Sequence, residues 1–287
     1  RGRFAPSPSG PLHFGSLVSA LASFLDAKAN HGKWLVRIED IDPPREQKGA
    51  DKAILKTLEA YGLYWDESVL YQSQQSQFYE QILQELDSKN LCYYCNCTRA
   101  KIKAIGGIYQ GHCKSLGLDK NQCATRLVNQ FGYYQYTDLV QGNISCDEQL
   151  AQEDFIIKRK DGLYAYQLAV VADDIAQNIT HIVRGCDLLE PTARQLTLYQ
   201  TLGKTPPKYA HIPLAVTDEG FKLSKQNKAP AINVDFPQRS LVKALEFLGQ
   251  KPDRYLFDAD VDSIIDWAVN NWILANVPKQ KEIMLAT

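Results

Sequence analysis

The first ninety residues alternate between short apolar segments typical of strands and longer segments whose apolar side chains recur at helical spacing. A loop rich in Pro, Ser and Gly, residues 6–11, connects the first strand to the first helix. Strands are expected over residues 3–5 and 34–38, and helices over residues 17–25, 45–61 and 75–89. This alternation predicts an α/β fold whose parallel sheet is built by right-handed crossovers.

The pattern changes after residue 90. Cysteines, tyrosines and glycines cluster over residues 91–123, and this segment reads as a subdomain inserted into the α/β fold. Asp161-Gly162 separates two apolar segments, residues 155–160 and 164–171, and predicts a β-hairpin. The remaining expected elements are strands over residues 181–183 and 212–216, a helix over residues 191–202, and helices after about residue 240.

Composition excludes several classes of protein. No stretch of about 18 apolar residues occurs, so no membrane span is expected, and the segment Arg1-Gly2-Arg3-Phe4 does not resemble a signal peptide. The seven cysteines are odd in number and unevenly spread, which is unlike a secreted disulfide scaffold. The net charge of −1 gives no general basic footprint, but only the local surface decides nucleic-acid binding. We expect a reduced, cytoplasmic, monomeric protein.

A candidate phosphate site lies between the first strand and the first helix, at Pro11-Leu12-His13-Phe14-Gly15-Ser16. Ligands of parallel sheets bind at the carboxyl ends of the strands, and a helix N-terminus there offers free N–H groups to phosphates. Gly15 lets a ligand approach the backbone closely, and His13 can donate to a phosphate or a ribose. Taken alone, the motif is weak evidence, and a satisfied loop histidine with a packing glycine explains it better than a phosphate site.

A second candidate is the basic loop Lys222-Leu223-Ser224-Lys225, which follows a turn. Two lysines three residues apart suit the charge that grows on a departing pyrophosphate. A solvated basic loop is the alternative explanation.

Residues 3–15, Arg-Phe-Ala-Pro-Ser-Pro-Ser-Gly-Pro-Leu-His-Phe-Gly, resemble the opening of glutamyl-tRNA synthetases. The signature of their class, class I, is a His-Ile-Gly-His element paired with a late Lys-Met-Ser-Lys-Ser loop. Three further segments follow in the family's order, so the resemblance covers residues 3–228: Arg37–Asp42, Tyr166–Ala169 and Val183–Gly185. Two positions depart from the class signature: Ser16 replaces its last His, and Gln226 replaces the last Ser of the loop.

The resemblance implies an enzyme that activates glutamate with ATP. The glutamate α-carboxylate would attack the α-phosphate of ATP without any protein nucleophile, and the protein would orient and stabilise charge. His13 and Lys225 are the candidate catalytic residues. The implied ATP site is His13, Gly15, Ser16, Lys222, Ser224 and Lys225, with Mg²⁺ carried by the phosphates.

The implied glutamate pocket is formed by Arg3, Phe4, Ala5, Pro6, Ser7, Glu39, Tyr166 and Arg184. We assign Glu39 to the α-ammonium, and Arg3 and Arg184 to the carboxylates, because Arg binds carboxylates in a bidentate way. Tyr166 would add a hydroxyl. Arg184 would face the side-chain carboxylate and so reject glutamine. On the sequence pattern alone, Glu39 and Arg37 are equally well explained as ordinary charges at a strand end.

The cysteine cluster Cys95-Asn96-Cys97…Cys113 suggests structural zinc, which prefers four tetrahedral ligands. Chemistry leaves the fourth ligand open between Cys92, Cys123, His112 and Tyr109, and small buried thiols without a metal are the alternative. The chain is similar to the shortened family of glutamyl-Q tRNA(Asp) synthetases, in which Cys-x-Cys, a Tyr and a Cys four residues later bind zinc. That similarity implies one structural Zn²⁺ held by Cys95, Cys97, Tyr109 and Cys113.

Length points to the same shortened family, because residues 227–287 suffice for one small helical domain but not also for an anticodon-binding region. The family activates glutamate without tRNA and transfers it to the queuosine base in the anticodon loop of tRNA(Asp). The expected partners are therefore ATP, L-glutamate and queuosine-bearing tRNA(Asp). The alternatives are a truncated glutamyl-tRNA synthetase that charges a 3′ end, a small-molecule adenylyltransferase, and a zinc-bearing RNA-binding module with an inactive core.

The fold expected from the resemblance is an α/β, Rossmann-like parallel sheet of the class I synthetase type, with an inserted zinc-bearing subdomain and a small C-terminal helical domain. Residues 1–90 and 151–210 would form the two halves of the catalytic domain, and residues 91–150 the zinc-bearing subdomain. Residues 211–287 would contain the lysine loop and a helical domain that resembles a stem-contact domain.

Overall fold

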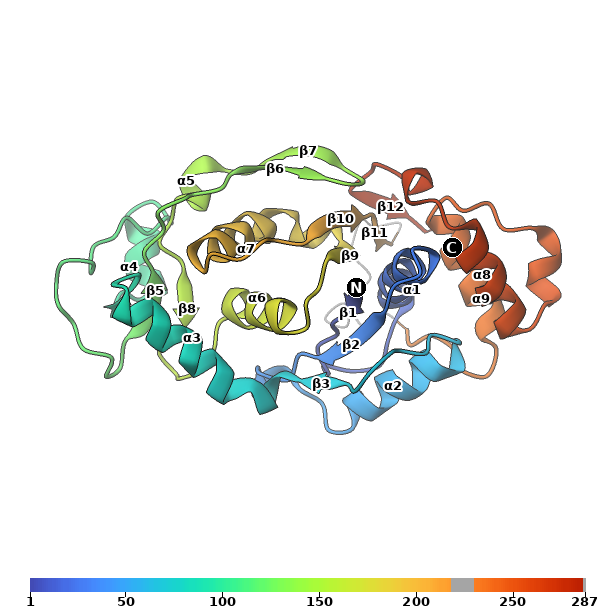
Figure 1. Cartoon of the computed structure of the whole chain (residues 1–287), viewed down its shortest axis with the longest axis horizontal. Coiled ribbons are helices and arrows are strands. Elements are labelled where there is room, and N and C mark those ends of the chain that lie inside the picture. The colour runs from blue at the N-terminus through green and yellow to red at the C-terminus, as the bar shows by residue number, and fades with distance from the viewer. Residues whose placement is uncertain (218–229, 286–287) are drawn as a thin grey trace.

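The computed structural model describes residues 1–217 and 230–285. Its first half is a parallel sheet in the order β1-β2-β3, formed by β1 (Gly2–Phe4), β2 (Trp34–Ile38) and β3 (Leu70–Tyr71). β1 and β2 are buried along their whole length, since helices cover both faces of a parallel sheet. Helix α1 (Phe14–Ala29) connects these two strands and lies against them in the centre of the molecule (Figure 1). The predicted parallel α/β organisation is confirmed.

A second parallel pair, β9 (His181–Gly185) and β10 (Lys208–Ile212), lies beside β1. The carbonyl oxygen of Arg1 accepts hydrogen bonds from the backbone N–H groups of Thr180 and His181, at 3.0 and 3.2 Å. Two helices belong to this half, α6 (Tyr166–Ala176) and α7 (Leu189–Thr201). The carboxyl ends of β1, β2 and β9 therefore come from both halves of the chain and meet at one edge.

The segment between the halves forms an antiparallel sheet and a separate hairpin. The sheet order is β4-β5-β8, and the strands are β4 (Cys92–Cys95), β5 (Ala124–Leu127) and β8 (Ile156–Lys158). The hairpin pairs β6 (Gln135–Asp138) with β7 (Gly142–Ser145) and extends above α7 toward β10 (Figure 1). Short helices flank these strands, α4 (Arg99–Ala104) and α5 (Glu148–Ala151). The inserted segment packs against both halves of the chain, because its sheet shares an apolar core with α3 (Ser76–Ser88), α6 and α7 and its hairpin contacts β10. Its role as a zinc-bearing subdomain stays a prediction.

Two helices lie at the edge of the first half and two near the C-terminus: α2 (Ala50–Ala60), α3 (Ser76–Ser88), α8 (Pro237–Phe247) and α9 (Val261–Asn271). Helices α8 and α9 pack on α1 and share one apolar core with β1 and β2. The chain then returns as β12 (Glu282–Met284), which pairs in parallel with β11 (Leu214–Val216) and was not predicted. The expected domain boundaries stay predictions.

Five short 3-10 helices complete the described elements: η1 (Pro43–Arg45), η2 (Gln72–Gln75), η3 (Cys186–Leu188), η4 (Arg254–Asp258) and η5 (Leu274–Asn276). None of the helices in residues 1–217 and 230–285 combines the length and the apolar character that crossing a membrane requires.

The hairpin predicted over residues 155–171 is wrong in its second strand. Only an isolated bridge joins Lys158 to Tyr164, and the chain then enters α6 at Tyr166. Residues 168–174 are all buried. Their sequence therefore shows neither the alternation typical of a half-buried strand nor the spacing typical of a half-buried helix. A short buried strand and a buried helix cannot be distinguished by such a pattern.

Two further expectations need adjustment. The expected strand over residues 212–216 is two strands, because Pro213 lies between β10 and β11 and has no N–H to donate. The helix expected from residue 45 begins only at Ala50, after η1.

Candidate active site

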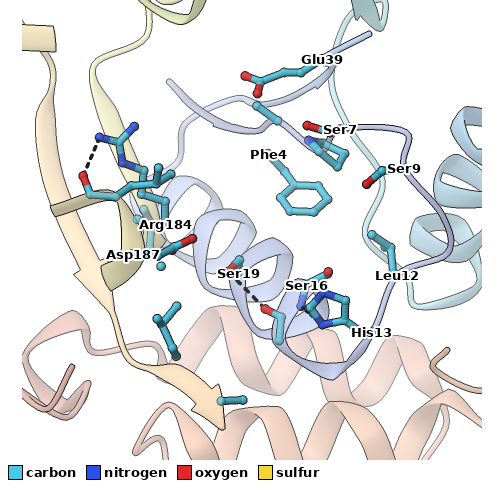
Figure 2. A pocket seen from close by; sticks show the side chains of 18 of the residues that line it. Phe4, Ser7, Ser9, Leu12, His13, Ser16, Ser19, Glu39, Arg184 and Asp187 are labelled. Carbon is cyan, nitrogen blue, oxygen red and sulfur yellow. Dashed lines mark hydrogen bonds between the residues drawn. The ribbon is translucent and has the colours of Figure 1, made fainter. Parts of the chain in front are cut away.

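A cavity of about 340 Å³ lies at the shared edge of the two parallel sheets, beside the N-terminus of α1. Figure 2 shows Glu39 and His13 toward opposite ends of this pocket, with Arg184 along one side. The structure brings together all the residues predicted for the glutamate and ATP sites that it describes: Arg3, Phe4, Ala5, Pro6, Ser7, His13, Gly15, Ser16, Glu39, Tyr166 and Arg184. The remaining three, Lys222, Ser224 and Lys225, lie outside the described residues.

The loop after β1 is held in place by backbone hydrogen bonds. The carbonyl oxygen of Pro6 accepts from the N–H of Glu39 at 3.0 Å, which ties the loop to the end of β2. The ring of Phe4 packs on Trp34 with 6.5 Å between centroids, so this pocket residue is anchored in the core. The pocket wall is therefore continuous with the apolar core that contains β1, β2 and α1.

His13 caps helix α1. Its Nδ1 accepts a hydrogen bond from the backbone N–H of Ser16 at 3.3 Å, as N-cap side chains do. A neutral imidazole that accepts at Nδ1 carries its proton on Nε2. His13 thus lies at the N-terminus of α1, where the positive end of the helix dipole favours an anion.

Behind the pocket, Asp174 joins two buried arginines. Arg3 donates to it from Nε and Nη2, at 3.1 and 3.2 Å, and Arg37 donates from Nη2 at 2.8 Å. Burial would raise the pKa of Asp174, but the two guanidinium groups hold it below the ordinary value. Nη1 is the nitrogen of Arg3 that makes no hydrogen bond to another described residue, so Arg3 has one nitrogen left for a ligand.

Glu39 directly follows β2 at the pocket wall, and its side chain is 10% exposed. Its Oε1 lies 3.7 Å from Nε of Arg37. Burial is the main cause that raises the pKa of Glu39 to about 7, and the charges of Arg37 and Arg3 oppose it. A carboxylate that is costly to ionise without a partner is suited to a cationic ligand.

Arg184, on β9, differs from Arg3 in the charge of its hydrogen-bond partners. It donates from Nε to His211 Nε2 at 3.1 Å, and from Nη2 to Thr192 and Gln195 at 2.6 and 2.8 Å. All these acceptors are neutral, and no described carboxylate lies within salt-bridge distance of Arg184. Its Nη1 is buried without a hydrogen-bond partner among the described residues. A buried, unneutralised guanidinium with one free nitrogen marks a site for an anion.

Tyr166 is the first residue of α6, and its hydroxyl-bearing side chain lines the same pocket. Tyr166 is 36% exposed, and its phenol, which is protonated near neutral pH, can donate a hydrogen bond to a ligand in the pocket. The pocket thus contains a proton donor, two arginines and a carboxylate.

The family model described as "tRNA synthetases class I (E and Q), catalytic domain" matches residues 1–257. The chain belongs to this class I synthetase family. It is accordingly a ligase, and the class I synthetase fold expected from the sequence is confirmed.

Relatives and solved structures support the assignment to the class I synthetase family. The chain is 65% identical to the glutamyl-Q tRNA(Asp) synthetase of Colwellia psychrerythraea, over 99% of this chain and 93% of the relative. Its identity to the protein of that name from Shigella flexneri is 55%, over 97% and 90%. It is also similar to a solved glutamate tRNA ligase from Elizabethkingia meningosepticum in complex with its amino acid, with a TM-score of 0.81 and 25% identity. That match covers 97% of this chain but only 65% of the ligase.

A second cluster in this class I synthetase contains three thiols. The Sγ atoms of Cys95, Cys97 and Cys113 lie within 4.8 Å of one another, and Cys97 and Cys113 are 3.5 Å apart. The buried Tyr109 adjoins them, since its hydroxyl accepts from the backbone N–H of Cys113 at 2.9 Å. The guanidinium of Arg126 lies 3.6 Å from the centre of the Tyr109 ring. The cluster could hold a metal such as zinc, for which three thiols and one oxygen form a suitable donor set.

The competing fourth ligands do not belong to this cluster. Cys92 points to Asp87, with 3.7 Å between Sγ and Oδ1. His112 is exposed, and neither it nor Cys123 is among the clustered side chains. Of the four candidates, Tyr109 is the one that packs in the same buried cluster as the three thiols.

Sequence reasoning missed several pocket residues of this synthetase, notably Asp187, Leu188 and Leu214. One signal for them was the glycine at position 185. A Cβ there would lie 2.7 Å from Asp187 Oδ1 and 2.8 Å from Leu214 Cδ2, so only glycine allows these groups to approach β9.

Proposed function

We propose that this protein activates L-glutamate with ATP to glutamyl-adenylate in the absence of tRNA, and then transfers the glutamate to queuosine in the anticodon loop of tRNA(Asp). The observation that carries the proposal is the pocket in which the buried, unneutralised Arg184 and the buried Glu39 face one cavity beside a helix N-terminus. The names of the relatives at 55–65% identity support the choice of acceptor.

Each charge of glutamate has a counterpart in this pocket. Glu39 receives the α-ammonium, Arg184 receives the side-chain carboxylate through Nη1, and Tyr166 donates a hydroxyl. Arg3 contributes positive charge near the α-carboxylate, although Asp174 takes two of its nitrogens. Glutamine lacks the second negative charge and would leave the Arg184 guanidinium buried and uncompensated.

Activation joins an oxygen of the glutamate α-carboxylate to the α-phosphorus of ATP, and the bond to the β-phosphate breaks, so that pyrophosphate leaves. His13 and the N–H groups of the first turn of α1, with Gly15 and Ser16, bind the nucleotide phosphates. Lys222, Ser224 and Lys225 complete the phosphate site, and Mg²⁺ comes with ATP, held by its phosphates. In the second step a hydroxyl of the queuosine ring attacks the adenylate carbonyl, and AMP leaves.

We further assign one structural zinc ion to Cys95, Cys97, Tyr109 and Cys113. The support is the proximity of the three thiols and of the Tyr109 hydroxyl in one partly buried cluster. Bound there, zinc would crosslink β4 to the loop that follows α4 and so stabilise the fold of the inserted segment.

The test is transfer of labelled glutamate to purified tRNA(Asp) that either carries or lacks queuosine. Both tRNAs are also prepared without their 3′-terminal adenosine. We expect labelling of queuosine tRNA(Asp) whether or not the terminal adenosine is present, and none of the tRNA without queuosine. Labelling that needs the terminal adenosine but not queuosine would instead identify a truncated glutamyl-tRNA synthetase.

A second assay separates the enzyme from a binding module. Glutamate-dependent exchange of pyrophosphate into ATP is measured without tRNA. We expect exchange with glutamate, and its absence with every amino acid would mean that the synthetase core is inactive.

A further inference from the structure

Arg184 is held from behind by an imidazole rather than by a carboxylate. His211, on β10, accepts the hydrogen bond from Arg184 Nε through its Nε2 at 3.1 Å. The two side chains lie on neighbouring strands, in the register that pairs Arg184 with His211. The guanidinium is also stacked 5.0 Å from the ring centre of Tyr209. In the orientation that these contacts support, Nη1 of Arg184 has no hydrogen-bond partner among the described residues.

The state of His211 follows from its second partner. Nδ1 lies 2.6 Å from Oδ2 of Asp138, and both side chains are fully buried. Since an ionised carboxylate only accepts, Nδ1 carries the proton and Nε2 presents its lone pair to Arg184. Burial, together with the charge of Arg184, lowers the pKa of His211, while Asp138 raises it. The imidazole is therefore neutral, and its tautomer is fixed.

Asp138 itself is rigidly placed. Its Oδ1 accepts from the backbone N–H groups of Val140 and Gln141 at 3.0 and 2.9 Å, and from that of His211 at 3.1 Å. It stands at the end of β6, in the hairpin of the inserted segment, whereas His211 and Arg184 belong to the second parallel pair. An element that lines no part of the amino-acid pocket thus fixes the orientation of a pocket arginine.

We propose that His211, oriented by Asp138, is a positioning residue that directs Nη1 of Arg184 toward the side-chain carboxylate of the amino-acid substrate. The inference rests on the proposed glutamate activation. A carboxylate in place of the imidazole would orient Arg184 equally well but would neutralise it, as Asp174 does to Arg3. The imidazole supplies an acceptor without charge, so the full charge of Arg184 remains available to distinguish glutamate from glutamine.

Two substitutions separate the two hydrogen bonds of His211, the one with Asp138 and the one with Arg184. His211→Asn keeps a donor near the Nδ1 position for Asp138 but removes the acceptor for Arg184. His211→Gln places an amide oxygen near the Nε2 position and can restore that acceptor. Tyr209 and Asp138 are unchanged in both variants. His31→Asn, at an exposed position with φ 54° that Asn tolerates, is the matched control.

The readout is pyrophosphate exchange without tRNA, with glutamate and with glutamine. For His211→Asn we expect the KM for glutamate to rise about tenfold or more, because a hydrogen bond to a charged group is lost. We expect kcat to change less than KM. The ratio of kcat/KM for glutamate to kcat/KM for glutamine should fall by a factor similar to the rise in KM. His211→Gln should recover most of both properties, and His31→Asn should match the wild type.

The outcomes are distinct. Unchanged KM and unchanged preference in a folded His211→Asn variant overturn the positioning role, whereas exchange that is absent in the wild type overturns the proposed function instead. If the variants do not fold, nitrogen-15 NMR of histidine-labelled wild-type protein decides. We expect a neutral His211 with its proton on Nδ1 between pH 6 and 8, and a proton on Nε2 or an imidazolium would contradict the proposal.

Discussion

The carboxylate of Asp174 accepts two hydrogen bonds from Arg3, at 3.1 and 3.2 Å, and both side chains are buried. One of its oxygens also accepts from Arg37. A helix from the second half of the chain thereby neutralises positive charge brought by β1 and β2. The pairing joins the two halves directly beneath the pocket.

This arrangement predicts a large effect of Asp174→Asn on stability. Removal of the negative charge leaves two guanidinium groups buried side by side, and breaking a buried pair costs about 3–5 kcal/mol. Urea unfolding should show this loss. Glu85→Gln, which removes an exposed ion pair with Lys89, serves as the control and should cost less than about 0.5 kcal/mol. Equal small losses in both variants would show that the Asp174 pair does not stabilise the fold.

The raised pKa of Glu39 predicts that ionised Glu39 lowers the stability of the fold but supports activity. Because its pKa is raised from 4.5 to about 7, its contribution to stability is complete below about pH 4.5 and is lost as the pH rises through 7. Glu39→Gln should therefore stabilise the protein at pH 8, by on the order of 1–3 kcal/mol. In the wild type, kcat/KM for glutamate should fall below about pH 7, where Glu39 gains a proton.

Thermal unfolding at pH 5 and pH 8, with pyrophosphate exchange over the same range, checks both statements. Glu59→Gln, on the exposed side of α2, is the control. A Glu39→Gln variant that activates glutamate normally would remove Glu39 from the ammonium site.

Arg184→Ala should abolish glutamate activation while the fold is kept. The loss in kcat/KM should be about a hundredfold or more, because the substrate carboxylate loses a buried charged partner. Stability should change little, since no described carboxylate pairs with Arg184. Exchange kinetics and urea unfolding measure the two effects, with the exposed Arg239→Ala as control. Unchanged exchange kinetics would exclude Arg184 from the pocket.

The thiol cluster predicts a metal content of about one zinc per chain. Cys97→Ser should lose most of it, and Tyr109→Phe should weaken binding about tenfold or more through loss of an oxygen ligand. Cys92→Ser should keep the metal, because the Cys92 thiol points to Asp87. Elemental analysis and unfolding temperatures with and without a chelator provide the measurements. Full zinc retention in Tyr109→Phe would show that another group completes the site.

The residues of the pocket could largely be predicted from the resemblance to glutamyl-tRNA synthetases, because the longest matching segment is local. Residues 3–16 form one continuous strand, loop and helix start. The strand expected over residues 34–38 agrees with β2 residue for residue, and the helix expected over residues 75–89 agrees with α3 to within one residue at each end. In both, apolar spacing alone decides the structure.

The groups that support the pocket could not be found in this way. Asp138 and His211 are 73 residues apart and meet only because the hairpin reaches β10. For Asp174 a signal did exist. Asp173 and Asp174 end an apolar run in α6, and two acids in a buried helix need buried cations or other hydrogen-bond donors as partners.

Glu39 has a consequence for the heat of binding. A carboxyl group that is partly protonated near neutrality must give up its proton when a substrate ammonium arrives beside it. Uptake of glutamate would then acidify an unbuffered solution, and the heat measured by titration calorimetry would depend on the ionisation enthalpy of the buffer. Amino-acid capture in this pocket would therefore be coupled to proton release.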